Sequence, residues 1–144
     1  MAVIYTRLSF DRHGDALAVE RQEADCREMA ARLGLAVTKV YPDNDLSATT
    51  GVVRPQFEAL LRDRPEVVLC WHTDRLVRTS RDLERVLEIG CTVHAVTAGT
   101  LDLSTPTGRA YARIGTAIAT MEVEHKVERQ VAANRQRRAM GQRH

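Results

Sequence analysis

An arginine and a serine stand two residues apart where the first apolar run of the chain ends, in the stretch Val3-Ile4-Tyr5-Thr6-Arg7-Leu8-Ser9. Side chains of a strand alternate between its two faces, so Arg7 and Ser9 point to the same side. A serine hydroxyl needs activation to act as a nucleophile, and a fixed guanidinium beside it suits a substrate that carries negative charge, such as a phosphate. The alternative is an ordinary strand end with two polar residues in a loop.

Further arginines follow the second and third apolar runs. Arg54 comes after the second run, and Asp74-Arg75-Leu76-Val77-Arg78 comes after the third. If the strands are parallel, their carboxyl ends meet at one edge of the sheet, where the active sites of such folds lie. There Arg75 and Arg78 are expected to share one face of a helical turn, and Asp74 can hold one guanidinium.

Crowded guanidiniums oppose folding unless an anion joins them. The arrangement therefore predicts a phosphodiester substrate, whose transition-state charge arginines can stabilise without a metal. Taken singly, Asp74, Arg75 and Arg78 fit solvated surface ion pairs better, and it is their joint placement after successive strands that favours a site.

Composition indicates one domain with a real core: the chain has 144 residues, of which 44% are hydrophobic. No apolar stretch approaches the roughly 18 residues of a membrane span, and no signal-peptide pattern begins the chain, so a cytoplasmic protein without membrane contact is expected. The cysteines Cys26, Cys70 and Cys91 are widely spaced without histidines in metal-ligand register. They are interpreted as buried thiols, and no structural metal is expected.

Basic residues gather at the end of the chain. No acid occurs between Arg129 and His144, which predicts a surface for a polyanion. The DNA-binding candidates in this stretch are Arg129, Arg135, Arg137 and Arg138. Among all 21 basic residues only Lys39 and Lys126 are lysine. That bias suits phosphate binding but could also reflect genome composition.

Short apolar runs alternate with helical periodicity, which predicts an α/β fold with a mostly parallel central sheet of about four strands flanked by helices. The expected strands are residues 2–6, 36–41, 67–71 and 92–97. Helices are expected between them, one of which starts at Pro55 and another with Ser80 as its N-cap. A long helix from Thr107 to about Met140 should project from the domain. Its apolar residues Ile114, Ile118 and Met121 could pack on a sister subunit or on the core of their own domain.

Several motifs in the same order resemble the catalytic domain of serine recombinases, the resolvase and invertase family, and look most like large serine integrases. The resemblance spans essentially the whole chain. It is carried by Tyr5-x-Arg7-x-Ser9, Gln22, Asp45-x-Ser47-Ala48 with Arg54-Pro55, Asp74-Arg75-Leu76-x-Arg78, and Glu122 with Glu128-Arg129.

The resemblance implies site-specific DNA recombination, in which Ser9 attacks a phosphodiester, forms a 5′-phosphoserine link and frees a 3′-hydroxyl. Arg7, Arg75 and Arg78 would bind the scissile phosphate, Arg54 would support them, and Asp74 would orient an arginine or assist proton transfer. Supporting roles would fall to Tyr5, Gln22, Asp45 and Glu128. No cofactor or metal is implied. The partners would be double-stranded DNA attachment sites and further copies of the chain, a homodimer that forms a tetramer on synapsis.

Residues 1–105 would then be the catalytic core and residues 106–144 an interface and DNA-arm helix with a basic end. Two positions depart from the family pattern: Ala48 stands where many relatives have glycine, and Val123 where small resolvases have arginine. No helix-turn-helix or cysteine cluster follows the long helix, so we expect a truncated chain without the DNA-recognition domains.

Two other functions remain open from the residues alone. A small phosphate-ester hydrolase or a non-catalytic nucleic-acid-binding module could use the same arginine-rich pocket. The hydrolase predicts a glycine-rich phosphate loop, which is missing from the sequence, or a metal-binding carboxylate pair. Asp43 and Asp45 are the candidates for that pair, but capping in a turn suits them better.

Overall fold

A central sheet with the strand order β2-β1-β3-β4-β5 organises the chain. The computed structural model describes residues 1–8, 15–44 and 54–141. Within them, β1, β2, β3 and β4 are parallel neighbours, and β5 is antiparallel to β4. The strands are β1 (Ala2–Leu8), β2 (Val37–Asn44), β3 (Val67–Cys70), β4 (Thr92–Ala95) and β5 (Gly99–Asp102). The helices are α1 (Asp15–Leu33), α2 (Pro55–Asp63), α3 (Thr73–Leu76), α4 (Ser80–Ile89) and α5 (Pro106–Ala139).

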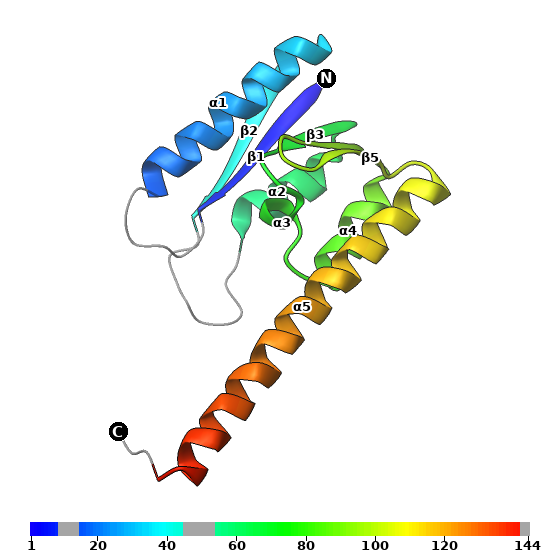
Figure 1. The fold of residues 1–144 in the computed structure, drawn as a ribbon. Helices are drawn as coiled ribbons and strands as arrows, with labels where there is room; N and C mark the ends of the chain where they lie inside the picture. Colours follow the sequence, from blue (N-terminus) through cyan, green and yellow to red (C-terminus); the bar gives the residue numbers. More distant parts are fainter. Residues whose placement is uncertain (9–14, 45–53, 142–144) are drawn as a thin grey trace.

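Strand β1 lies between β2 and β3, and its side chains pack on both faces of the sheet. Ala2 and Ile4 pack with Cys26 and Ala30 of α1 on one face, whereas Tyr5 packs on the other face in the larger core, to which α2 and α4 contribute. In Figure 1, α1 accordingly lies on the side of the sheet opposite to α2 and α4. The α/β expectation is confirmed, and the three cysteines are buried as predicted.

Three local expectations were incomplete or wrong. The strand β5 was not predicted, because its residues are largely exposed and show no apolar alternation. Its partner β4 ends at Ala95, where the chain turns back, rather than at Thr97. The N-cap of α4 is Thr79 instead of Ser80: Thr79 has extended backbone angles, and its Oγ1 accepts a hydrogen bond from Asp82 N at 3.1 Å.

The helix α5 is attached to the domain only near its start. Thr105 is its N-cap, and Gly108 and Ala112 are its buried residues. The Arg113 guanidinium pairs with both carboxylate oxygens of Glu84 on α4, at 2.9 and 3.1 Å. The rest of α5 projects from the domain (Figure 1), as predicted. None of the described helices is long and apolar enough to cross a membrane.

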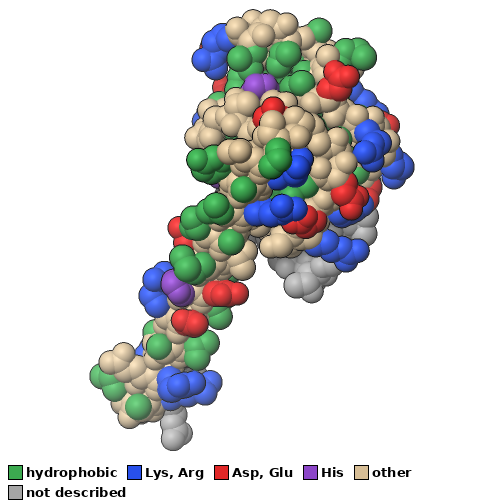
Figure 2. Space-filling model, turned by 90° about the vertical axis from the view of Figure 1, so that its right-hand side faces the viewer, with side chains coloured by type: hydrophobic (Ala, Val, Ile, Leu, Met, Phe, Trp, Pro, Cys, Tyr) green, Lys and Arg blue, Asp and Glu red, His purple; other side chains and the backbone are tan. Residues whose placement is uncertain are grey.

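Three apolar side chains of α5 that could have closed the core of their own domain are instead exposed. Ile114, Ile118 and Met121 are 56%, 48% and 47% exposed. Figure 2 shows hydrophobic side chains spread along this arm, with Lys and Arg side chains toward its far end.

Candidate active site

Arg7 is held near the end of β1 by main-chain groups. Its side chain is on the same face of β1 as Tyr5, and the residue is 7% exposed. Nη2 donates a hydrogen bond to the carbonyl oxygen of Asp74 at 2.8 Å, and Nε donates to that of Arg75 at 3.2 Å. The backbone of Arg7 is fixed from the other side of the sheet by Gln22 of α1. The Gln22 amide accepts from Arg7 N at 3.5 Å and donates to Arg7 O at 3.4 Å. The orientation of this guanidinium is therefore set before any ligand binds.

Other arginines surround Arg7 closely enough to affect its ionisation. Burial, and then the charges of Arg78, Arg54 and Arg75, lower the pKa of Arg7. An arginine in a protein nevertheless stays protonated, so the positive charges are crowded together. Within the part of the chain that the structure describes, the buried Nε of Arg75 has no hydrogen-bond partner. Such a cluster favours binding of an anion.

Arg54 supports the cluster from inside the protein. It is 8% exposed, and its guanidinium lies 4.0 Å from the centroid of the Phe57 ring. Its Nη1 donates to Tyr5 Oη at 3.3 Å and to the carbonyl oxygen of Leu76 at 3.0 Å, while Nη2 pairs with Asp82 Oδ2 at 2.8 Å. These N–H groups donate to atoms of the protein itself. That is what a residue in the supporting role expected for Arg54 would do.

Tyr5 and Asp43 extend this buried network to α2. Tyr5 donates to Asp43 Oδ2 at 2.7 Å, and burial raises the pKa of Tyr5 well above its ordinary value, so the phenol stays neutral. Asp43, at the end of β2, also accepts from the main-chain N–H groups of Gln56 and Phe57, each at 2.9 Å. Both Asp43 oxygens thus cap the start of α2, where a negative charge is stabilised. Among the described residues, no group of three or more acids, histidines or cysteines could hold a metal ion.

Asp74 orients Arg7 through its main-chain carbonyl and not through its carboxylate. Its carboxylate lies beside His72, with Oδ1 3.0 Å from His72 Nδ1, while its main-chain carbonyl holds Arg7. The expectation that Arg75 and Arg78 share a helical face is wrong. The helix α3 ends at Leu76, and Val77 is extended with φ −116° and ψ 120°, so the two arginines belong to different local structures.

The remaining predicted site residues divide into three groups. Ser9 and Asp45, together with Ser47 and Ala48 of the same motif, lie outside the described residues. Glu122 of α5 lines a groove that Arg7 and Arg78 also line. Exposed positions farther along α5, which do not line this groove, hold Glu128, Arg129, Arg135, Arg137 and Arg138.

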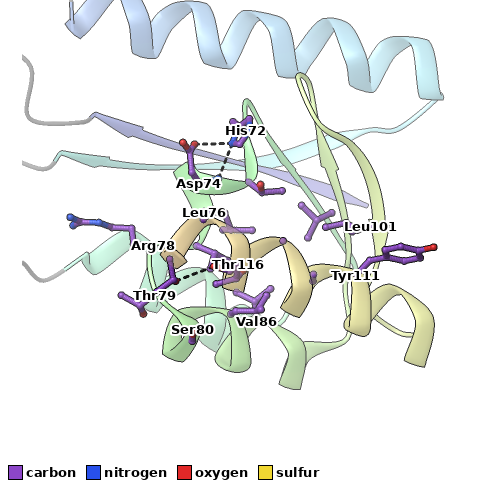
Figure 3. A pocket seen from close by; sticks show the side chains of 18 of the residues that line it. His72, Asp74, Leu76, Arg78, Thr79, Ser80, Val86, Leu101, Tyr111 and Thr116 are labelled. Carbon is purple, nitrogen blue, oxygen red and sulfur yellow. Dashed lines mark hydrogen bonds and ion pairs between the residues drawn. The ribbon is translucent and has the colours of Figure 1, made fainter. Parts of the chain in front are cut away.

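The groove lies between α5 and the segment that includes α3 and α4, and its volume is about 1010 Å³. Most of its wall is apolar and includes Val86 and Leu101, as Figure 3 shows. The arginine cluster therefore borders an apolar surface.

Sequence reasoning missed Asp82, although it joins two arginines of the site. The available signal was the spacing Thr79-x-x-Asp82, which is typical of a helix start and indicates no more than a cap.

Comparison with known proteins shows which family the chain belongs to. The sequence model of the resolvase N-terminal domain matches residues 2–143. The chain therefore belongs to the resolvase family, whose N-terminal domain is the catalytic domain of serine recombinases. This membership implies site-specific DNA recombination.

Solved structures of three such domains are similar. The N-terminal catalytic domain of TP901-1 integrase has a TM-score of 0.62 and 24% identity, over 85% of this chain and 96% of that chain. A resolvase family site-specific recombinase from Streptococcus pneumoniae has a TM-score of 0.64 and 18% identity, over 96% and 97%. The C-terminal catalytic domain of ISC1926 TnpA, an IS607-like serine recombinase, has a TM-score of 0.54 and 28% identity, over 66% and 69%. No curated protein sequence matches significantly.

Proposed function

We propose that this domain cleaves and rejoins DNA with Ser9 as the nucleophile. The Ser9 oxygen loses its proton and forms a bond to phosphorus, while the bond from phosphorus to the 3′-oxygen breaks. The 3′-oxygen takes a proton and leaves as a hydroxyl, and the 5′-phosphate stays on Ser9. The reverse attack by a 3′-hydroxyl from another site restores a phosphodiester and frees the serine. The energy of the broken bond is kept in the ester, so no ATP is needed.

The observation that supports this chemistry is the fixed guanidinium of Arg7. It lies two residues before Ser9 on the strand that leads to it, with two hydrogen bonds from the guanidinium to carbonyls of α3. Arg75 and Arg78 lie close enough to lower its pKa. Preorganised cations of this kind stabilise the charge that builds on phosphate oxygens during in-line displacement. We assign Arg7, Arg75 and Arg78 to the phosphate and Arg54 to their support.

The helix α5 is proposed to serve assembly and DNA contact as a unit distinct from the core of residues 1–105. The exposed Ile114, Ile118 and Met121 would pack on a second subunit, and pairs of dimers would meet as a tetramer when two DNA sites synapse. The exposed arginines near the end of α5 would contact backbone phosphates. Phosphate contacts position a protein on DNA without reading its sequence.

Ser9→Ala tests the nucleophile directly. The chain is incubated with nicked DNA duplexes of randomised sequence, the DNA is digested with nucleases, and tryptic peptides are analysed by mass spectrometry. Trypsin releases the peptide Leu8-Ser9-Phe10-Asp11-Arg12, in which Ser9 is the only side chain with a hydroxyl group. We expect a nucleotide adduct on this peptide in the wild type and none in Ser9→Ala.

Ser80→Ala is the matched control, because Ser80 is an exposed serine of α4. It should leave the adduct unchanged. An adduct that persists in Ser9→Ala, an adduct on another peptide, or none in the wild type would contradict the proposal. The same reaction in EDTA separates it from a metal-dependent phosphate-ester hydrolase, because the serine adduct should form at an unchanged rate.

A further inference from the structure

Asp82 joins two arginines of the site, although none of the motifs that carry the family resemblance includes it. It is the third residue of α4, and its side chain is 19% exposed. Oδ2 accepts a hydrogen bond from Arg54 Nη2 at 2.8 Å and from the main-chain N–H of Arg78 at 3.1 Å. One carboxylate oxygen thus connects the buried supporting arginine with the backbone of a phosphate-binding arginine.

Capping of α4 does not account for these contacts. The cap is made by Thr79, whose hydroxyl accepts from the main-chain N–H of Asp82. The Asp82 carboxylate instead reaches the residue before that cap and a guanidinium from the start of α2. An acid in the first turn does stabilise a helix through its dipole, so Asp82 has a structural role as well.

The ion pair of Asp82 and Arg54 fixes the connection between α3 and α4 at two points. Arg54 holds the carbonyl of Leu76, and Asp82 holds the N–H of Arg78. Between them Val77 is extended, so the direction in which Arg78 leaves the backbone depends on both anchors. In Figure 3 the exposed side chain of Arg78 extends away from the apolar residues Val86 and Leu101.

We propose that Asp82 is a positioning residue for DNA cleavage: through Arg54 and the backbone of Arg78, it sets the Arg78 guanidinium toward the scissile phosphate. This inference rests on the proposed function. Asp82→Asn keeps the shape of the side chain but removes its charge. Arg54 is then buried without its carboxylate and rearranges, because an uncompensated buried charge is unfavourable. Arg78 loses its fixed direction as a consequence.

Glu58→Gln is the matched control. Glu58 of α2 pairs with Arg85 of α4, with Oε1 2.7 Å from Nη1, so this pair joins the same two helices through a different arginine. Both substitutions remove one carboxylate charge between α2 and α4. Only Asp82→Asn changes a carboxylate that anchors Arg78.

A double-mutant cycle of Asp82→Asn with Arg78→Ala tests the proposal on the rate of Ser9 adduct formation. If Asp82 acts through Arg78, Asp82→Asn slows the wild type at least about tenfold but slows Arg78→Ala by less than about twofold. Glu58→Gln should change the rate less than about twofold. Equal slowing in both backgrounds would reduce Asp82 to a structural role and overturn the proposal.

If the wild type forms no adduct, the proposed Ser9 chemistry is refuted. Two further measurements still test the role of Asp82 in that case. Amide hydrogen exchange at Arg78 should be faster in Asp82→Asn than in Glu58→Gln. Affinity for a short DNA duplex at low salt should fall in Asp82→Asn, but not fall further in the Arg78→Ala background. Unchanged exchange, or an affinity loss independent of Arg78, would overturn the positioning role.

Discussion

Arg7 and Arg54 use their hydrogen-bond donors largely on the protein itself. Arg7 binds the carbonyls of Asp74 and Arg75, and Arg54 binds Tyr5, Leu76 and Asp82. The two carbonyls carry no formal charge, so these bonds orient the Arg7 guanidinium without neutralising it, whereas Arg54 is paired with the Asp82 carboxylate.

The Tyr5 hydroxyl links Asp43 to Arg54, so its removal should destabilise the protein. In Tyr5→Phe, both partners keep another hydrogen bond, Asp43 from Phe57 N and Arg54 to Leu76 O. The free energy of unfolding should therefore fall by about 1 to 2 kcal/mol. Urea denaturation measures this change.

Tyr41→Phe is the control for this prediction. The hydroxyl of Tyr41 donates to Asp63, whose side chain is 49% exposed, so water can replace the lost partner. The loss should stay below about 1 kcal/mol. Equal losses in the two variants would show that the buried network adds no stability.

At the residue scale, spacing predicted which side chains meet but not how they bind. The gathering of Arg7, Arg54, Arg75 and Arg78 follows from parallel strands ending at one edge. The carbonyl of Asp74 could not be foreseen, because every residue has a carbonyl and the sequence does not mark which one is used. The position of Ser9 beside these arginines stays a prediction.

At the element scale, α5 packs so closely at its start that one position has no room for a side chain. A Cβ added at Gly108 would lie 1.8 Å from the carbonyl oxygen of Asp102, which is a main-chain atom that cannot rotate away. Gly108→Ala should therefore displace the start of α5 and lower the free energy of unfolding by about 2 to 3 kcal/mol. Thermal unfolding provides the measurement.

Gly115→Ala, in the same helix, should instead raise the free energy of unfolding. Apart from its chain neighbours and the nearby backbone of its own helix, a Cβ at Gly115 meets no atom within 4 Å, and alanine favours a helix over glycine by up to about 1 kcal/mol. A Gly108→Ala variant as stable as the wild type would mean that α5 does not pack there as described.

Strands with a strong apolar pattern were predictable, and the largely exposed strand β5 was not. The runs that became β1 to β4 carry buried apolar side chains, whereas β5 is held by main-chain pairing with β4 that leaves no mark in the sequence. The long helix was predictable from its length without proline, and its boundaries were close to those observed.

At the scale of the whole molecule, the exposed apolar side chains of α5 predict self-association. Sedimentation velocity should show that the wild type sediments faster as its concentration rises. Ile118→Glu should shift it toward the monomer, because a charge in an apolar interface is unfavourable. Met140→Glu, at the exposed end of α5, should leave the association unchanged. A wild type that stays monomeric at high concentration would argue against a dimer through α5.

Because α5 is attached to the domain at one end only, a small rotation there moves its far end over a larger distance. Past Thr116 no residue up to Ala139 is buried, and this part measures roughly 35 Å at 1.5 Å per residue. A tilt of about 5° at Gly108 and Ala112 would carry the far tip through roughly 3 Å, which is the length of a hydrogen bond. Small repacking against β5 and α4 is thereby converted into a displacement large enough to change which phosphates the terminal arginines reach.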